Sequence, residues 1–199
     1  MTKILILTAL AAELEDQPLP FRLPVVFTGV GKVNAALATA EAIRQHQPHC
    51  VVNYGTAGGV SARAVGLHEV HAVIQRDMMA EPLAPRGQTP FDDTPVRLHS
   101  ASTDAQGLLC ASGDSFVSSA DPWLTAQGVD LVEMELWGIA MACQRAGVPW
   151  RAWKYVSDQA NEDSHHDWAE NVHRGREAFI AALHQAWPDI GSLAARPSA

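Results

Sequence analysis

The sequence predicts a single-domain α/β protein with three layers, in which helices cover both faces of a central mixed, twisted sheet (α/β/α). Short apolar runs rich in Val, Ile and Leu recur, and longer segments between some of them have helical periodicity. The 199 residues, 47 % of them hydrophobic, can bury one sizeable core, and this length suits one domain better than two. We therefore expect one domain over residues 1–190 and a flexible tail over residues 191–199.

Strands are predicted where short apolar runs lie between turn-forming residues such as Gly, Pro, Asn and Asp. The first run follows the N-terminus at once, and the second and third each precede a glycine-rich stretch. The predicted strands are residues 4–7, 25–27, 50–54, 70–74, 108–111, 131–132 and 150–156.

Two helices are predicted from apolar residues that recur on one face. The first spans residues 32–45, and its inward stripe is Val33, Ala36, Leu37, Ala40 and Ile43. The second spans residues 134–145, and its inward residues are Leu136, Ile139, Ala140 and Cys143. Gly147 stands just past the end of the second helix, which is typical of a helix C-terminus.

A third helix is predicted over residues 167–187, where it would close the fold. Its apolar residues recur at helical spacing and are Trp168, Val172, Phe179, Leu183 and Trp187. Residues 78–104, in contrast, carry several prolines and almost no periodicity. They are predicted to form a long loop or flap, and loops of that length in compact domains are usually functional.

Charge and cysteine content exclude several classes of protein. The formal charge is -8 and no basic run occurs, so neither nucleic acid nor an anionic membrane is an expected partner. The apolar N-terminal run is too short for a signal peptide, and no run reaches the roughly 20 residues of a membrane helix. Cys50, Cys110 and Cys143 are odd in number and widely spaced, as in reduced packing residues. We expect a cytoplasmic protein without disulfides or a metal site.

Glycine clusters and carboxylates mark the predicted strand ends. The clusters are residues 28–32 and 55–59, where glycine lets the backbone come close to a ligand. Glu133 and Glu135 stand where a strand gives way to a helix, and Asp158 directly follows another strand. Carboxyl ends of strands in an open α/β sheet are where ligands gather, and Glu13, just beyond the first strand, could converge on the same rim. Each acid taken alone is better explained as a helix cap or a solvated surface group.

At these residues the sequence resembles the nucleoside phosphorylase superfamily and, within it, the methylthioadenosine/S-adenosylhomocysteine nucleosidases. The resemblance covers most of the chain, and its motifs occur in the family's order. They are GVGKVNAA at 29–36, NYGTAGG at 53–59, SGDSF at 112–116, VEME at 132–135 and VSD at 156–158. The resemblance implies a nucleoside phosphorylase-like fold, a small purine nucleoside as substrate, a homodimer, and neither cofactor nor metal.

Catalytic roles follow from the resemblance for three acids. Asp158 would protonate or hydrogen-bond N7 of adenine, Glu13 would orient or activate water, and Glu135 with Met134 would hold the ribose 2'- and 3'-hydroxyls. This suits a reaction in which an electron-rich purine leaves an oxocarbenium-like sugar, because an acid stabilises the base and negative groups stabilise the sugar. The implied activity is hydrolysis, in methionine salvage and purine nucleoside catabolism.

Binding roles follow in the same way. Phe116 would stack on the purine, Val117 would contact it through its backbone, and Thr56 stands where the family has a Ser near the ribose. Further substrate-binding residues are expected at Gly31, Met78, Glu133 and Ser157.

Water is favoured over phosphate as the nucleophile. Many phosphorylases of this superfamily place an Arg two residues before the Gly-Ser or Gly-Thr step, where it grips phosphate, and here that residue is Asn53. Lys32 or Arg76 could still supply a phosphate site, so phosphorolysis stays an alternative. A catalytically inactive relative that binds adenine nucleosides is a second alternative, although it would have no need of the three acids.

Several features depart from the family pattern. The chain is short, Lys154 stands where the family often has Arg, and Trp137 follows Glu135 where small residues are common. The 5' group stays open, with methylthioadenosine, S-adenosylhomocysteine, 5'-deoxyadenosine, aminofutalosine and larger adenosyl conjugates as candidates. Residues 75–83 could wall its pocket, contributed by a neighbouring subunit, or simply pack a dimer. The adjacent His165 and His166 are interpreted as capping residues, because no further ligands stand at metal-binding spacing.

Overall fold

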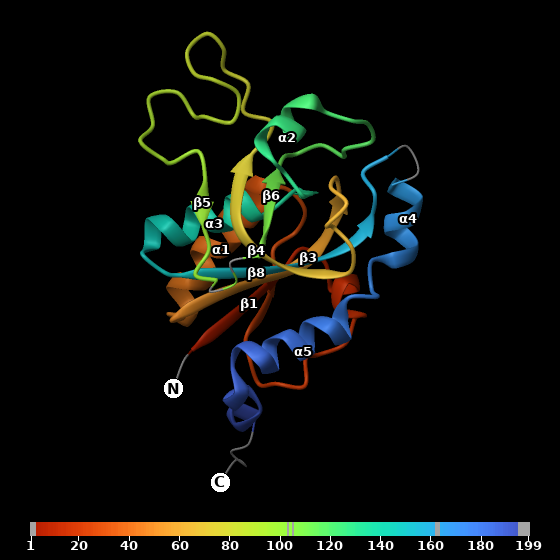
Figure 1. The fold of residues 1–199 in the computed structure, drawn as a ribbon. Helices are drawn as coiled ribbons and strands as arrows, with labels where there is room; N and C mark the ends of the chain where they lie inside the picture. The colour runs from red at the N-terminus through yellow and green to blue at the C-terminus, as the bar shows by residue number, and fades with distance from the viewer. Residues whose placement is uncertain (1–2, 103, 105, 162–163, 195–199) are drawn as a thin grey trace.

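The computed structural model describes residues 3–102, 104, 106–161 and 164–194. A mixed eight-stranded sheet lies between helices, as the sequence predicts (Figure 1). The strands are β1 (Ile4–Thr8), β2 (Val25–Phe27), β3 (Cys50–Gly59), β4 (Leu67–Gln75), β5 (Leu98–His99), β6 (Leu108–Ser112), β7 (Leu131–Glu133) and β8 (Trp150–Asp158). The α-helices are α1 (Lys32–His46), α2 (Pro122–Gln127), α3 (Leu136–Ala146), α4 (Ser164–Asn171) and α5 (Arg176–Ala186), and 3-10 helices η1 (Ala11–Leu14) and η2 (Pro188–Ala194) complete the set.

The sheet closes on itself around five of its strands. β3 pairs with β7, β7 with β6, β6 with β4, β4 with β8, and β8 again with β3. β1 and β2 extend the sheet from β3, and β5 pairs with β4. This closure brings the ends of β3, β7 and β8 together, although they are far apart in the sequence.

Alternation along the strands divides the core between the two faces of the sheet. In β1, Leu5 and Leu7 pack on the face covered by α1 and α3, whereas Ile4 and Ile6 pack on the face covered by α5. Figure 1 shows α5 well apart from the adjacent pair α1 and α3. These buried apolar faces hold the strands whose ends carry the acidic residues.

The inward stripe predicted for α1 is wrong in its first half. Val33 and Leu37 are 68 % and 67 % exposed, and the buried residues of α1 are Ala35, Thr39 and Ala42. The cause is close packing against α3, where a Cβ on Gly138 would lie only 2.3 Å from the backbone oxygen of Lys32. Small residues therefore face the core at Ala35, Thr39 and Ala42, and Val33 and Leu37 face outward, while Ile43 packs against the core as predicted. In α3, by contrast, the residues predicted to point inward are all fully buried, and Gly147 ends the helix with φ 66°.

The third predicted helix is two helices, α4 and α5, with a turn over residues 172–175 between them. Gly175 is the residue that requires the break. A Cβ at this position would lie 2.5 Å from both Tyr155 and the hydroxyl of Tyr54, so the chain passes too close to the sheet for any other residue. The apolar residues predicted for the single helix are divided between the two, with Phe179 and Leu183 fully buried in α5.

Three strands, β3, β4 and β8, are longer than predicted by two residues or more, and the second glycine cluster lies inside β3. Gly55, Gly58 and Gly59 are part of β3, and the register of β3 against β8 shifts between Ala57 and Gly58. A Cβ at Gly58 would lie 2.9 Å from Oδ1 of Asp158, and one at Gly55 would lie 3.0 Å from Oε1 of Glu13. The glycines of β3 therefore make room for carboxylates.

The predicted long loop contains only the short strand β5 among its described residues. Arg86 ties the loop to α2, donating to Asp121 at 2.6 Å and lying 4.4 Å above the Trp123 ring. Residues 191–194 belong to η2, while residues 195–199 of the predicted tail lie outside the described residues, so the predicted boundary at 190 stays a prediction. Within the described residues, no helix is long and apolar enough to cross a membrane.

Candidate active site

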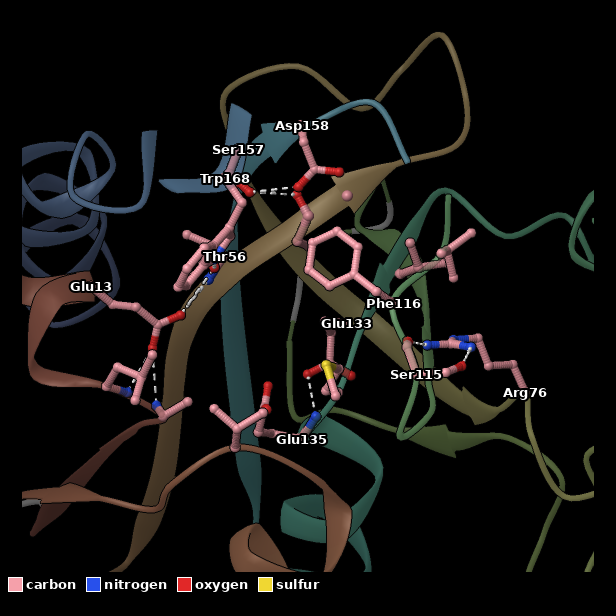
Figure 2. A pocket seen from close by; sticks show the side chains of 18 residues that line it. Glu13, Thr56, Arg76, Ser115, Phe116, Glu133, Glu135, Ser157, Asp158 and Trp168 are labelled. Carbon is pink, nitrogen blue, oxygen red and sulfur yellow. Dashed lines mark hydrogen bonds between the residues drawn. The ribbon is translucent and has the colours of Figure 1, made fainter. Parts of the chain in front are cut away.

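A cavity of about 260 Å³ lies where β3, β7 and β8 end. Figure 2 shows the labelled acidic side chains arranged around it together with the Phe116 ring. The lining residues are Ala9, Leu10, Glu13, Val30, Thr56, Ala57, Gly58, Arg76, Ser115, Phe116, Val117, Val132, Glu133, Met134, Glu135, Ser157, Asp158 and Trp168. Almost every predicted site residue is thus brought to one place.

The hydrogen bonds that Glu13 accepts from the described residues all come from neutral donors. Its position on η1, directly after β1, places Oε2 within 2.7 Å of the Thr8 hydroxyl and about 3 Å from the backbone N–H groups of Ala9 and Leu10. Oε1 accepts from the backbone N–H and the hydroxyl of Thr56, at 2.8 and 3.1 Å. Five donors therefore fix the orientation of this buried carboxylate, which is only 4 % exposed.

Glu133 and Lys154 form a buried ion pair beside the cavity, with Nζ of Lys154 2.9 Å from Oε2 of Glu133. The same oxygen accepts from the backbone N–H groups of Glu135 and Leu136, and Ser112 donates to the other oxygen. Burial alone lowers the pKa of Lys154, but Glu133 and Glu135 outweigh it and raise the pKa, so the ammonium stays charged. For Glu133, Lys154 and the hydrogen bonds outweigh burial and lower the pKa.

Glu135 stands at the start of α3 and is less well supported. Its Oε1 accepts a 2.9 Å hydrogen bond from the backbone N–H of Gly31, at the N-terminus of α1. Burial, together with the nearby charge of Glu133, raises the pKa of Glu135 from 4.5 to about 7. Gly31, which does not itself line the cavity, therefore contributes by holding Glu135.

Asp158 ends β8 and is 6 % exposed. The Ser157 hydroxyl donates to Oδ2 at 2.9 Å, and the backbone N–H of Ala160 donates to Oδ1 at 3.0 Å. These two donors orient the carboxyl group while it borders the cavity (Figure 2). Asp158 can therefore meet a polar atom of a ligand without losing its orientation.

An aromatic and a cationic residue form the opposite wall, a feature that the sequence reveals only in part. Arg76 is 5 % exposed and donates to the hydroxyl of Ser115 at 3.0 Å and to the backbone oxygens of Gly113 and Ser115. It thereby fixes the segment that carries Phe116, a residue that is 47 % exposed and lines the cavity. Val117 continues the same wall.

Both cations considered for phosphate are engaged elsewhere. The guanidinium of Arg76 is directed to the 113–115 segment, and Nζ of Lys32 forms an ion pair with Asp77 and a 3.2 Å hydrogen bond with Gln75. Asn53 is 2 % exposed, donates to the backbone oxygen of Leu7, and does not line the cavity. A strong anion site is therefore missing from the described cavity wall.

Trp168 is one of the lining residues that sequence reasoning missed as site residues, together with Ala9, Leu10, Val30, Ala57, Ser115 and Val132. It lies on the apolar stripe of α4, and that spacing predicts packing as readily as a site role. Met78 is the opposite case, a predicted site residue that does not line the cavity of this single chain. Its predicted contact with the substrate stays a prediction. No cluster suited to a metal ion occurs among the described residues, and the side chains of His165 and His166 lie outside them.

Comparisons with known proteins agree with this geometry. Residues 22–186 match the phosphorylase superfamily. A 5'-methylthioadenosine/S-adenosylhomocysteine nucleosidase from Shewanella halifaxensis is 31 % identical over 81 % of this chain and 80 % of its own, and one from Exiguobacterium sp. is 32 % identical over 70 % and 69 %. The crystal structure of S-adenosylhomocysteine nucleosidase from Streptococcus pyogenes, in complex with 5-methylthiotubericidin, matches with a TM-score of 0.79 at 25 % identity, covering 92 % of this chain and 97 % of that one. The chain belongs to the phosphorylase superfamily and, within it, to the family of 5'-methylthioadenosine/S-adenosylhomocysteine nucleosidases.

Proposed function

We propose that the protein is a purine nucleosidase that hydrolyses the N-glycosidic bond of a 5'-substituted adenosine and releases adenine. The observation that carries the proposal is the meeting of Glu13, Glu135 and Asp158, from distant parts of the chain, around one cavity beside Phe116. Carboxylates placed around a cavity with an aromatic wall suit a reaction that develops positive charge on a sugar and negative charge on a base.

Each wall then has a role in the reaction. Phe116 stacks on adenine, and Asp158 donates a proton or hydrogen bond to N7 while the bond between C1' and N9 breaks. Glu135 accepts hydrogen bonds from the ribose hydroxyls, with Met134 against the sugar. Glu13 orients a water molecule and takes its proton as the oxygen bonds to C1', so the products are adenine and a 5-substituted ribose.

Water is proposed as the nucleophile because Arg76 and Lys32, the two cations considered for phosphate, already bind other parts of the chain. Phosphate would need a bidentate cation, whereas Arg76 binds the 113–115 segment and Lys32 binds Asp77. The side chain at the phosphorylase Arg position is the neutral, buried Asn53.

The deciding experiment measures adenine release by ultraviolet absorbance from purified protein, with and without phosphate. Release that is independent of phosphate is the expected result. Strict dependence on phosphate would make the protein a phosphorylase, and absence of release together with nucleoside binding would make it a binding protein. Substrates for the assay are methylthioadenosine, S-adenosylhomocysteine, 5'-deoxyadenosine and aminofutalosine, and their ranking identifies the 5' group.

A homodimer is part of the proposal. The outward apolar residues of α1, Val33 and Leu37, together with Met79 and Leu83 on the long loop, are each more than 60 % exposed in the single chain. Apolar surface of this kind is typical of an interface, and Met78 and its neighbours would then border the 5' group of a partner's substrate. Light scattering should give twice the monomer mass of 21.4 kDa, and Leu37→Glu should lower it.

The three buried, free cysteines support the proposed cytoplasmic location.

A further inference from the structure

Trp168 makes a polar contact inside the cavity that its place on an apolar helix stripe does not suggest. Its indole Nε1–H donates a 3.0 Å hydrogen bond to Oγ1 of Thr56, and Figure 2 shows the ring beside that residue, near Glu13. The ring also lines the cavity. Trp168 thus touches the site through a hydrogen bond as well as through packing.

The chemistry of the two groups fixes the direction of this hydrogen bond. An indole N–H can only donate, whereas a hydroxyl has one proton to donate and lone pairs to accept. Since Oγ1 of Thr56 accepts from Trp168, its own proton is directed to the other neighbour at bonding distance, Oε1 of Glu13 at 3.1 Å. The three groups form a chain in which every donor points toward Glu13.

The Thr56 hydroxyl is the one whose direction matters to a ligand. Two side-chain hydroxyls donate to Glu13, and of these Thr56 lines the cavity while Thr8 does not. A carboxylate offers about four lone-pair sites, and five donors already surround Glu13. A water molecule that meets Glu13 must therefore share an oxygen with one of these donors, and the Thr56 hydroxyl is the donor side chain that lines the cavity.

The helix that carries Trp168 is attached to the site at a second point. Asn171, one turn later on α4, donates from Nδ2 to the backbone oxygen of Ser157 at 2.9 Å. Ser157 in turn orients Asp158. Hydrogen bonds to β3 and to β8 thus hold α4 across the ends of both strands, which fixes the indole where it meets Thr56.

We propose that Trp168 is a positioning residue that, through its indole N–H, fixes the Thr56 hydroxyl on Glu13 and so sets where the attacking water binds. The inference rests on the proposed nucleosidase function. It assigns Trp168 an action on turnover through Thr56, and packing alone would not produce such coupling.

A double-mutant cycle tests this coupling. Trp168→Phe keeps an aromatic ring and removes the N–H, and it should lower kcat for adenine release about 3- to 10-fold with a much smaller change in KM. In a Thr56→Val background the same substitution should change kcat less than about twofold, because the hydroxyl is already absent. Trp187→Phe, a matched change beside Arg151 and outside the cavity, should leave kcat unchanged. Equal effects of Trp168→Phe with Thr and with Val at position 56 would overturn the proposal.

A second measurement does not depend on activity. In a ¹H–¹⁵N NMR spectrum, the indole signal that Trp168→Phe removes identifies Trp168, and the five other tryptophans serve as internal references. Thr56→Val should shift this signal and speed its hydrogen exchange, while Thr56→Ser should preserve both. An unchanged signal in Thr56→Val would refute the hydrogen bond itself. If the wild-type protein released no adenine, the proposed function would fail, yet this spectrum would still decide whether Trp168 holds the hydroxyl.

Discussion

Two sides of the cavity hold their carboxylates by different means. On the Glu13 side, five neutral donors surround one carboxylate. On the Glu135 side, two carboxylates, Glu133 and Glu135, share the single ammonium of Lys154. The first arrangement spreads support over many hydrogen bonds, whereas the second concentrates it in one cation. Loss of a single supporting group should therefore lower the stability of the protein only a little on the Glu13 side and much more on the Glu135 side.

The two sides also differ in what they control: the Glu13 side fixes the orientation of a carboxylate, and the Glu135 side shifts the pKa of its carboxylates. Neutral donors hold Glu13 at a fixed orientation, which suits a group that must place a water molecule. Lys154 and hydrogen bonds outweigh burial at Glu133 and leave it with a lowered pKa, whereas burial and the charge of Glu133 leave Glu135 with a raised pKa. Sensitivity to pH should therefore arise on the Glu135 side, where the ribose is proposed to bind.

The largest expected effect concerns Asp158, which belongs to neither side and is proposed to act on the base. Asp158→Asn should lower kcat for adenine release by about 10²- to 10⁴-fold, because the amide cannot deliver a proton to N7. Nucleoside affinity, measured by calorimetry, should stay within a few-fold of wild type. Asp93→Asn, the same change at an exposed position, is the control. Turnover close to wild type would remove Asp158 from the mechanism.

The next largest effect tests whether Lys154 is the main support of the carboxylates on the Glu135 side. Lys154→Met should lower the free energy of unfolding by about 3–5 kcal/mol, since it leaves the buried charge of Glu133 without its cation. Denaturant unfolding measures this loss. Adding Glu133→Gln to Lys154→Met should recover much of the stability, because the uncompensated charge is then gone. If Lys154→Met lowered the free energy of unfolding by less than about 1 kcal/mol, Lys154 would not be the main support of Glu133.

The fold was largely predictable because its signals are local. Buried strands are recognisable in the sequence as short apolar runs. The bounds of β1, β2, β6 and β7 match the predicted ranges to within one residue. Partner-dependent features were not predictable. Val33 and Leu37 are apolar yet exposed, and the closeness of α1 to α3, which turns Ala35 inward, depends on Gly138 more than one hundred residues away. The break of the last helix at Gly175 was not predictable for a similar reason. The two tyrosines that crowd Gly175, Tyr54 and Tyr155, lie on β3 and β8, which are distant from it in the sequence.

The site was predictable as a set of residues, through the family resemblance, and less so as a set of contacts. Spacing and motif identify Glu13, Glu135 and Asp158, but the sequence does not show that Lys154 pairs with Glu133 and not with Glu135. Arg76 could be read as a phosphate ligand until its bonds to the 113–115 segment are known. Hydrogen-bond direction is a property of three-dimensional neighbours, and for that reason Trp168 is indistinguishable from a core residue in the sequence.

A smaller effect is expected from pH. Because the pKa of Glu135 is raised from 4.5 to about 7, this carboxylate, which is proposed to accept hydrogen bonds from the ribose hydroxyls, is mostly protonated at pH 6 and mostly ionised at pH 8. KM should therefore be about tenfold higher at pH 6 than at pH 8. Conversely, the contribution of Glu135 to stability is full below pH 4.5 and is lost as the pH rises through about 7. In Glu135→Gln the KM should be high and no longer vary with pH, and a variation identical to wild type would assign it to another group.

The smallest effect sharpens the comparison by removing one hydroxyl from each side. Thr8→Val deletes one of the five donors to Glu13, and with four remaining it should cost about 1 kcal/mol of stability and change kcat less than about threefold. Ser112→Ala deletes a donor to Glu133 and also leaves the buried backbone N–H of Trp137 without its acceptor, so it should cost about 2 kcal/mol. Denaturant unfolding of the two variants, with kcat from adenine release, measures both quantities. If Thr8→Val proved the more damaging, support for Glu13 would rest on that one hydroxyl and the contrast between the two sides would be wrong.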